Sequence, residues 1–145
     1  MSAPPSLLAT WVDALEGILP PPGSRIALPA CADRSGSDLD RLADTDLHVI
    51  AVRLQGDLTA PAASPRREQV RHLQRQLADA ALLGAHAAWL DTPAPTLPHI
   101  AEALELLDTF ALARRVILIV NPVRDSAGWL VLPTTAGTFH VVGVP

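Results

Sequence analysis

The chain has 145 residues and a mass of 15.3 kDa, the size of one ordinary domain. Apolar residues make up 49% of it, so it can bury a core and is not disordered as a whole. Its net charge of -4 argues against a general nucleic-acid binder, and all 11 of its cationic residues are arginines, which excludes a lysine Schiff base and a phosphate-loop lysine.

The N-terminal residues 1–22 are expected to form a helical segment followed by a proline-rich linker. Apolar side chains recur at offsets of three and four between Leu7 and Leu19, which is the spacing of an amphipathic helix. The run Pro20 to Gly23 would then end that helix, because none of these residues favours its continuation.

From residue 25 onward the chain alternates between strand and helix patterns. Strands are predicted over residues 25–30, 47–54, 85–90 and 115–120, and the last is apolar enough to suggest burial on both faces. Helices are predicted between them, over residues 38–43, 64–83 and 96–113. Two final segments, 129–132 and 138–144, predict an antiparallel hairpin.

This alternation predicts a single α/β domain over residues 1–145. We expect three layers, with a mainly parallel sheet of about four strands, and a C-terminal antiparallel hairpin added at one edge of that sheet. The only cysteine is Cys31, so no internal disulfide framework is expected. The N-terminus lacks a basic signal region and no apolar run is long enough for a membrane span, so a cytoplasmic location without membrane contact is the simple interpretation.

Polar side chains stand at or just after the ends of the four predicted parallel strands, with Gln55 as the alternative to Arg53 at the second. Ligands of open α/β sheets bind outside the carboxyl ends of the strands, so this rim is a candidate site for an anionic or polar ligand. Its members are Asp33, Arg34, Arg53, Asp91, Asn121 and Arg124. The alternative is that they are ordinary turn formers and helix caps.

The loop from Cys31 to Ser37 is the most site-like segment of this rim. Gly36 and the next helix start could present backbone N–H groups to an anion, but the loop matches neither GxxxxGK[ST] nor GxGxxG. A buried, inert thiol before a capped helix is therefore the favoured interpretation. His99 and Glu102 share a helix face but are too few for a metal site, so neither a metal nor another cofactor is expected and no catalytic residue is assigned.

Two further features suggest contact with another macromolecule. Arg67, Arg71 and Arg75 repeat every four residues and form a basic stripe on one helix. Trp129 on the terminal hairpin could anchor a partner protein. The alternatives are a solvated helix face and an aromatic residue packed in the core.

The layout of several segments resembles the SulA-type SOS cell-division inhibitors. The likeness rests on Ser24–Pro29 with the strand at Leu47–Val52, on the helix and strand ending Ala87-Ala88-Trp89-Leu90, and on Ile117–Val123, where Asn121 stands in place of an arginine. This resemblance implies a RecA-like fold without a Walker motif, and a protein that binds the division protein FtsZ and blocks its polymerisation.

The favoured hypothesis is therefore a non-catalytic module that binds another protein, with a homo-oligomer left open. The alternative is a small enzyme or ligand-binding domain that uses the polar rim. A third class, a nucleic-acid accessory protein using the arginine stripe, is disfavoured by the acidic charge and by aromatic residues making up only 3% of the chain.

Overall fold

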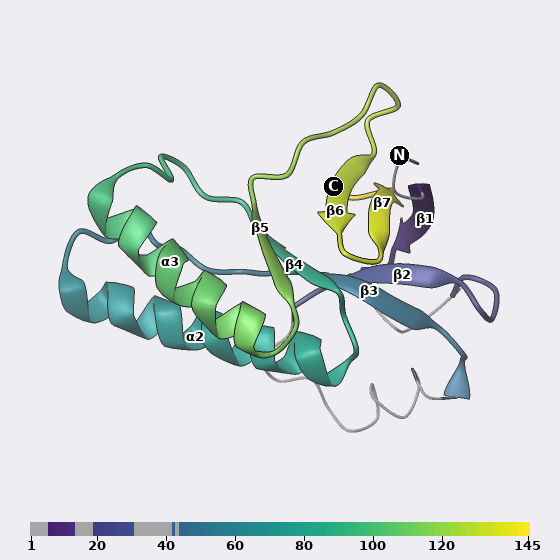
Figure 1. Cartoon of the computed structure of the whole chain (residues 1–145), viewed down its shortest axis with the longest axis horizontal. Coiled ribbons are helices and arrows are strands. Elements are labelled where there is room, and N and C mark those ends of the chain that lie inside the picture. Colours follow the sequence, from purple (N-terminus) through teal and green to yellow (C-terminus); the bar gives the residue numbers. More distant parts are fainter. Residues whose placement is uncertain (1–5, 14–18, 31–41, 43) are drawn as a thin grey trace.

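The computed structural model describes residues 6–13, 19–30, 42 and 44–145, and its centre is a single mixed sheet (Figure 1). Its strands are β1 (Ser6–Trp11), β2 (Arg25–Pro29), β3 (His48–Arg53), β4 (Ala87–Leu90), β5 (Ile117–Val120), β6 (Leu130–Thr134) and β7 (Gly137–Val142). Two long helices accompany them, α2 (Ala63–Leu82) and α3 (Pro98–Ala113).

The strands stand in the order β5-β4-β3-β2-β1-β7-β6. Neighbours from β5 to β7 are all parallel, and only the final pair, β6 with β7, is antiparallel. The α/β class, the mainly parallel sheet and the terminal hairpin are thus confirmed, whereas the expected count of about four parallel strands is too low because a strand was missed at the start.

The predicted N-terminal helix is wrong, because its first part is strand β1. Leu7, Ala9 and Trp11 alternate toward one core cluster, while Leu8 points the other way and is 53% exposed. The spacing of apolar residues fits a helix equally well. The segment forms a strand because β2 and β7 flank it and pair with it through backbone hydrogen bonds on both edges.

The sheet curls until its concave face packs against itself. The ring of Trp11 lies 5.8 Å from that of Trp89, although β2 and β3 separate their strands in the sheet. Similarly, the His86 ring, just before β4, stacks at 5.9 Å on Phe139 of β7. The sheet is therefore barrel-like. The strand–helix alternation predicted helices on both faces of a sheet, but the concave face of this sheet is filled by its own side chains.

The chain that leaves β5 also pairs with β6. The Val131 N–H donates to the Val123 carbonyl at 2.9 Å, and an antiparallel bridge joins Arg124 to Leu130. The segment following β5 thus connects the two ends of the sheet. β5 itself is half-buried along its length, so the expected burial of that strand on both faces is wrong.

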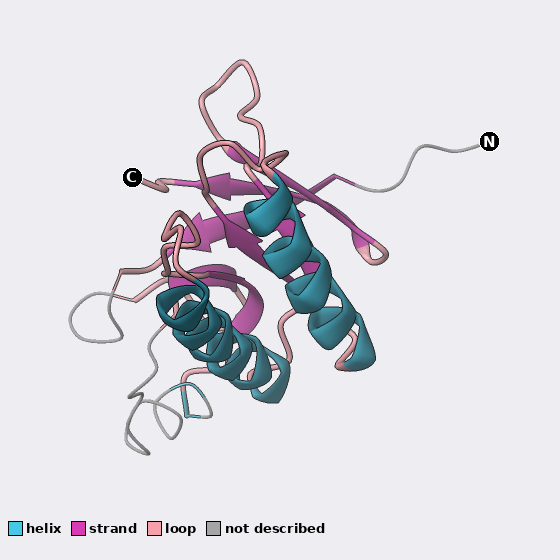
Figure 2. Ribbon diagram, turned by 90° about the vertical axis from the view of Figure 1, so that its left-hand side faces the viewer, coloured by secondary structure: helices cyan, strands magenta, loops and turns pink. Residues whose placement is uncertain are grey.

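Both described helices cover the same, convex side of the sheet, over β3 to β5 (Figures 1 and 2). Leu73 and Leu77 of α2 and Leu107 of α3 are fully buried in the cluster that they share with β4. These two helices were predicted to within two residues at each end, and Gly84 ends α2 with a φ of +80° as its position suggested. The short helix predicted over 38–43 falls almost wholly outside the described residues.

Within the described ranges, no helix combines the length and the apolar character that crossing a membrane requires.

Candidate functional site

An open pocket of about 490 Å³ lies where β1, β2, β3 and β4 end. Because these strands are parallel, their carboxyl ends meet at one edge of the sheet, and each contributes to the pocket. Its polar and aromatic lining includes Trp11, Asp13, Arg53, Gln55 and Asp91.

An ion pair joins the ends of two of these strands. Arg53 Nη2 donates to Asp91 Oδ2 at 3.1 Å, with side-chain exposures of 31% and 52%. A pair this exposed adds little to stability, on the order of 0 to 1 kcal/mol. Its effect is positional, since each partner restricts where the other can point.

A second carboxylate enters the pocket from the end of β1. The Trp11 indole N–H donates to Asp13 Oδ1 at 2.7 Å, and the Trp11 ring in turn rests against the buried Trp89. An aromatic ring and a carboxylate are thereby held together at the end of β1. Both residues were missed by sequence reasoning, because the segment was assigned to a helix and its strand end was not recognised.

The loop after β3, which forms one wall, is tied to α2 by a buried amide. Gln76 is 2% exposed, and its side chain accepts from the Gln55 N–H at 2.8 Å and donates to the Gln55 carbonyl at 2.7 Å. Gly56 follows, and a Cβ there would lie 2.9 Å from two atoms of the Leu73 side chain. The loop therefore approaches α2 as closely as its backbone allows. Gln76 was also missed, and the available signal was a polar residue on the apolar face of a predicted helix.

The same loop continues through a small polar turn. The Asp57 N–H donates to Gln69 Oε1 at 3.0 Å, and Asp57 Oδ1 accepts from the Thr59 N–H at 2.8 Å. The Thr59 hydroxyl donates to the same carboxylate, and these bonds hold the pKa of Asp57 below its usual range. Asp57 therefore stabilises the turn in its charged form.

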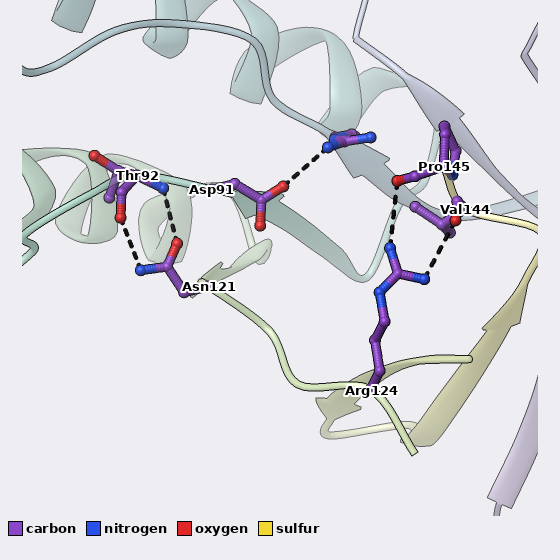
Figure 3. Close-up of polar contacts among 7 residues, drawn as sticks. Asp91, Thr92, Asn121, Arg124, Val144 and Pro145 are labelled. Atoms are coloured by element: carbon purple, nitrogen blue, oxygen red, sulfur yellow. Dashed lines mark hydrogen bonds and ion pairs between the residues drawn. The ribbon is translucent and has the colours of Figure 1, made fainter. Parts of the chain in front are cut away.

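Two of the predicted rim residues have their polar atoms engaged by the backbone (Figure 3). The Asn121 side chain accepts from the Thr92 N–H and donates to the Thr92 carbonyl, both at 2.8 Å. Arg124 donates to the carbonyls of Val144 at 3.2 Å and Pro145 at 3.3 Å. Neither side chain lines the pocket, but Pro145 does, so Arg124 supports one wall from behind.

Of the predicted rim, the structure thus brings Arg53 and Asp91 together in the pocket. Asp33 and Arg34, with Cys31, lie outside the described residues. Among the described residues, no group of three or more histidine, aspartate or glutamate side chains gathers in a way that could hold a metal ion.

The predicted partner residues lie elsewhere. Arg67, Arg71 and Arg75 are exposed on α2, and none forms an ion pair with a described residue. Trp129 is 36% exposed in the loop before β6, with its N–H donating to Asp125 Oδ1 at 3.0 Å. These residues are not part of the pocket.

Comparison with known proteins identifies the fold and no more. No protein family model matches the chain, and no curated protein sequence is significantly similar to it. Its structure is similar to that of the protein SMc04130 from Sinorhizobium meliloti 1021, with a TM-score of 0.56 and 22% identity over 69% of this chain and 41% of the other. It is also similar to a xylose isomerase domain protein from Planctomyces limnophilus, with a TM-score of 0.52 and 16% identity over 86% of this chain and 55% of the other.

The chain therefore spans about half the length of these structural neighbours. Neither neighbour is described as a SulA-type protein. Instead, the fold, in which β1 to β5 stand in consecutive order in a curled sheet, is similar to that of a xylose isomerase domain protein. The predicted function as a SulA-like inhibitor of cell division is thus wrong. The alternative, a small enzyme or ligand-binding domain that uses the carboxyl ends of the strands, agrees better with the fold.

Proposed function

We propose that this protein binds a small, neutral, polyhydroxylated molecule, a sugar or related polyol, in the pocket at the carboxyl ends of β1 to β4. The observation that carries the proposal is the placement of Asp13, Arg53 and Asp91 around one 490 Å³ pocket at this edge of a barrel-like sheet. A pocket of that volume is within the range of about 300 to 1,000 Å³ typical of small-molecule sites.

The donors and acceptors of the pocket match those of adjacent hydroxyl groups. The carboxylates of Asp13 and Asp91 accept hydrogen bonds from hydroxyls, and the Arg53 guanidinium donates to hydroxyl oxygens. The Trp11 ring offers an apolar surface to the C–H face of a sugar. Two carboxylates against one guanidinium make the pocket net negative, so a neutral ligand is favoured over the anionic ligand that the sequence left open.

The position of the pocket supports the same class of function. In barrels of parallel strands, ligand and catalytic sites lie at the carboxyl ends of the strands. One structural neighbour carries the name xylose isomerase domain protein, which agrees with sugar chemistry at this edge, although the identity of 16% supports the fold alone.

Isothermal titration calorimetry with D-xylose, D-ribose and myo-inositol tests the proposal, with inorganic phosphate as the anionic probe. We expect saturable binding of at least one polyol and no binding of phosphate. Arg53→Ala should weaken that binding by roughly tenfold or more, because hydrogen bonds to charged groups contribute about 1.5 to 3 kcal/mol.

A matched pair of variants separates the pocket from general charge effects. Asp91→Asn should weaken polyol binding, whereas Asp46→Asn, the same change just before β3 at the opposite end of that strand, should leave it unchanged. Binding of phosphate in preference to every polyol, or equal effects of the two substitutions, would contradict the proposal.

A further inference from the structure

The outer surface of the two helices contains a groove whose two sides have opposite charge. α2 and α3 lie side by side on the convex face of the sheet (Figure 1). Between them is a depression of about 390 Å³, lined from α2 by Arg67, Val70 and Arg71 and from α3 by Glu102 and Leu106. A second hollow continues it past Glu105, Leu106 and Phe110.

Along the two hollows the charges are divided by helix, and the exposed Glu68 of α2 lies outside them. Arg67, Arg71 and Arg75 are exposed along α2, and Glu102 and Glu105 are exposed along α3. None of these five forms an ion pair within the described part of the chain. Four of them, Arg67, Arg71, Glu102 and Glu105, line the hollows and are therefore available to a partner there.

The two charged rows also stand at the same level. Both helices run in the same direction, since each connects one parallel strand to the next. Arg71 and Glu102 line the same depression, and Gln74 lies level with Glu105 and Leu106 in the next one. A rotation about an axis parallel to the helices would keep these levels unchanged.

We propose that this helix face is the interface of a homodimer, with the two-fold axis running parallel to α2 and α3. In that arrangement α2 of each copy lies over α3 of the other, so Arg71 meets Glu102 of the second copy. A two-fold axis across the helices would instead place α2 on α2 and oppose arginine to arginine. Like charges placed opposite each other are strongly unfavourable at an interface, so the charges select the first arrangement.

The apolar residues of the groove are also consistent with a second copy of the chain as the partner. Leu106 is 55% exposed, and the half-buried Val70 and Phe110 flank it between the two charged rows. An apolar strip inside a charged rim is the usual anatomy of a protein interface. A purely acidic partner, whether protein or nucleic acid, would meet the carboxylates of α3 as well as the arginines of α2. A second copy presents both signs at matching levels.

Sedimentation equilibrium of four proteins tests the dimer: the unaltered chain, Arg71→Glu, Glu102→Arg and the control Arg25→Glu. Arg25 is exposed at the start of β2, does not line the groove, and carries the same charge change. We expect the unaltered chain and the control to dimerise at micromolar concentration, and each helix variant to dissociate with a Kd raised about tenfold or more.

Mixing the two helix variants gives the sharpest result. In the mixed dimer, the glutamate introduced by Arg71→Glu in one copy meets the arginine introduced by Glu102→Arg in the other. The unaltered Glu102 of the first copy meets the unaltered Arg71 of the second, so both contacts are attractive again. We expect the equimolar mixture to recover dimers that neither variant forms alone.

A monomeric unaltered chain, an unchanged Kd for Arg71→Glu, or a mixture that stays monomeric would each overturn the proposal. None of these substitutions lies in the strand-end pocket, so the outcome is independent of polyol binding.

Discussion

The two halves of the curled sheet are stabilised in different ways. Over β3, β4 and β5 the convex face is covered by α2 and α3, and outward residues such as Ala88 and Leu90 are buried beneath them. Over β1, β7 and β6 no described helix covers the convex face, and Leu8 and His140 point outward there. The first half therefore buries both faces of β3 and β4, whereas the second buries mainly its concave face.

The difference matters for the site because the pocket lies at the seam between the halves. Trp11 and Asp13 come from the end of β1, in the uncovered half, and Arg53 and Asp91 come from β3 and β4 in the covered half. A ligand that contacts both walls bridges two differently supported regions. In the uncovered half, hydrogen bonds from Arg124 to the backbone of Val144 and Pro145 help to hold the chain in place. In the covered half, helix packing has this role.

The largest contrast is expected from deleting apolar side chains. Leu77→Ala removes a fully buried side chain of α2 and should lower the free energy of unfolding by about 2 to 5 kcal/mol. Leu8→Ala on the uncovered face should lower it by no more than about 0.5 kcal/mol. Urea denaturation measures both, and similar losses for the two variants would mean that another part of the molecule covers Leu8.

A smaller effect is expected from the buried amide that ties the pocket loop to α2. Gln76→Leu keeps the shape but leaves the N–H and carbonyl of Gln55 without their partner, which should cost about 1 to 3 kcal/mol. His72→Leu, on the same helix, outside the groove and without a described hydrogen bond, should change stability by about 0.5 kcal/mol or less. Chemical denaturation of the two variants checks this. Equal losses in the free energy of unfolding would show that the Gln76 hydrogen bonds do not contribute to stability.

The tether at Arg124 should respond mainly in ligand affinity. Arg124→Ala releases the carbonyls of Val144 and Pro145, and Pro145 forms part of the pocket wall. We expect a loss of stability of about 1 kcal/mol and weaker polyol binding, measured by thermal unfolding and calorimetry respectively. If affinity is unchanged while stability falls, Pro145 does not contribute to binding.

The smallest effect concerns acid stability in the uncovered half. His140 Nδ1 donates to Asp125 Oδ2 at 2.8 Å, and this bond, followed by the Trp129 N–H, holds the pKa of Asp125 below its usual range. A lowered pKa in the folded state stabilises the fold above the unfolded-state value of about 3.9, and that stabilisation is lost as the pH falls through the folded-state pKa.

Unfolding followed at a series of pH values below about 5 should therefore show a shallower acid loss for Asp125→Asn than for the unaltered chain. Asp108→Asn on α3 provides the control, because Asp108 has no described ion pair. Identical acid profiles for Asp125→Asn and the unaltered chain would show that the bond between His140 and Asp125 does not contribute to acid stability.

Sequence patterns predict the covered half well and the uncovered half poorly, for a physical reason. In α2 and α3 the 3.6-residue period repeats over many turns, so Leu73, Leu77 and Leu107 identify the inward face without ambiguity. β1 is only a few residues long, and its apolar pattern fits both periods. The neighbouring strands decide between them, and their positions are not encoded locally.

The same limit explains the site. Arg53 and Asp91 were identified because each stands at the end of a recognisable strand, whereas Asp13 was missed together with β1. Asn121 and Arg124 also follow a strand, but their polar atoms bond to backbone groups of Thr92, Val144 and Pro145 that are distant in sequence. A residue type alone does not reveal whether its partner is a ligand or the chain itself.

An NMR titration of the ¹⁵N-labelled protein with the polyol that binds best tests the central claim most directly. The account predicts saturable shifts of the amides at the carboxyl ends of the strands, at Trp11, Asp13, Gln55 and Asp91, with no change at the opposite strand ends around Ser24 and Asp46. Shifts confined to the opposite ends of the strands or to the helix groove, or no saturable shift for any polyol, would contradict it.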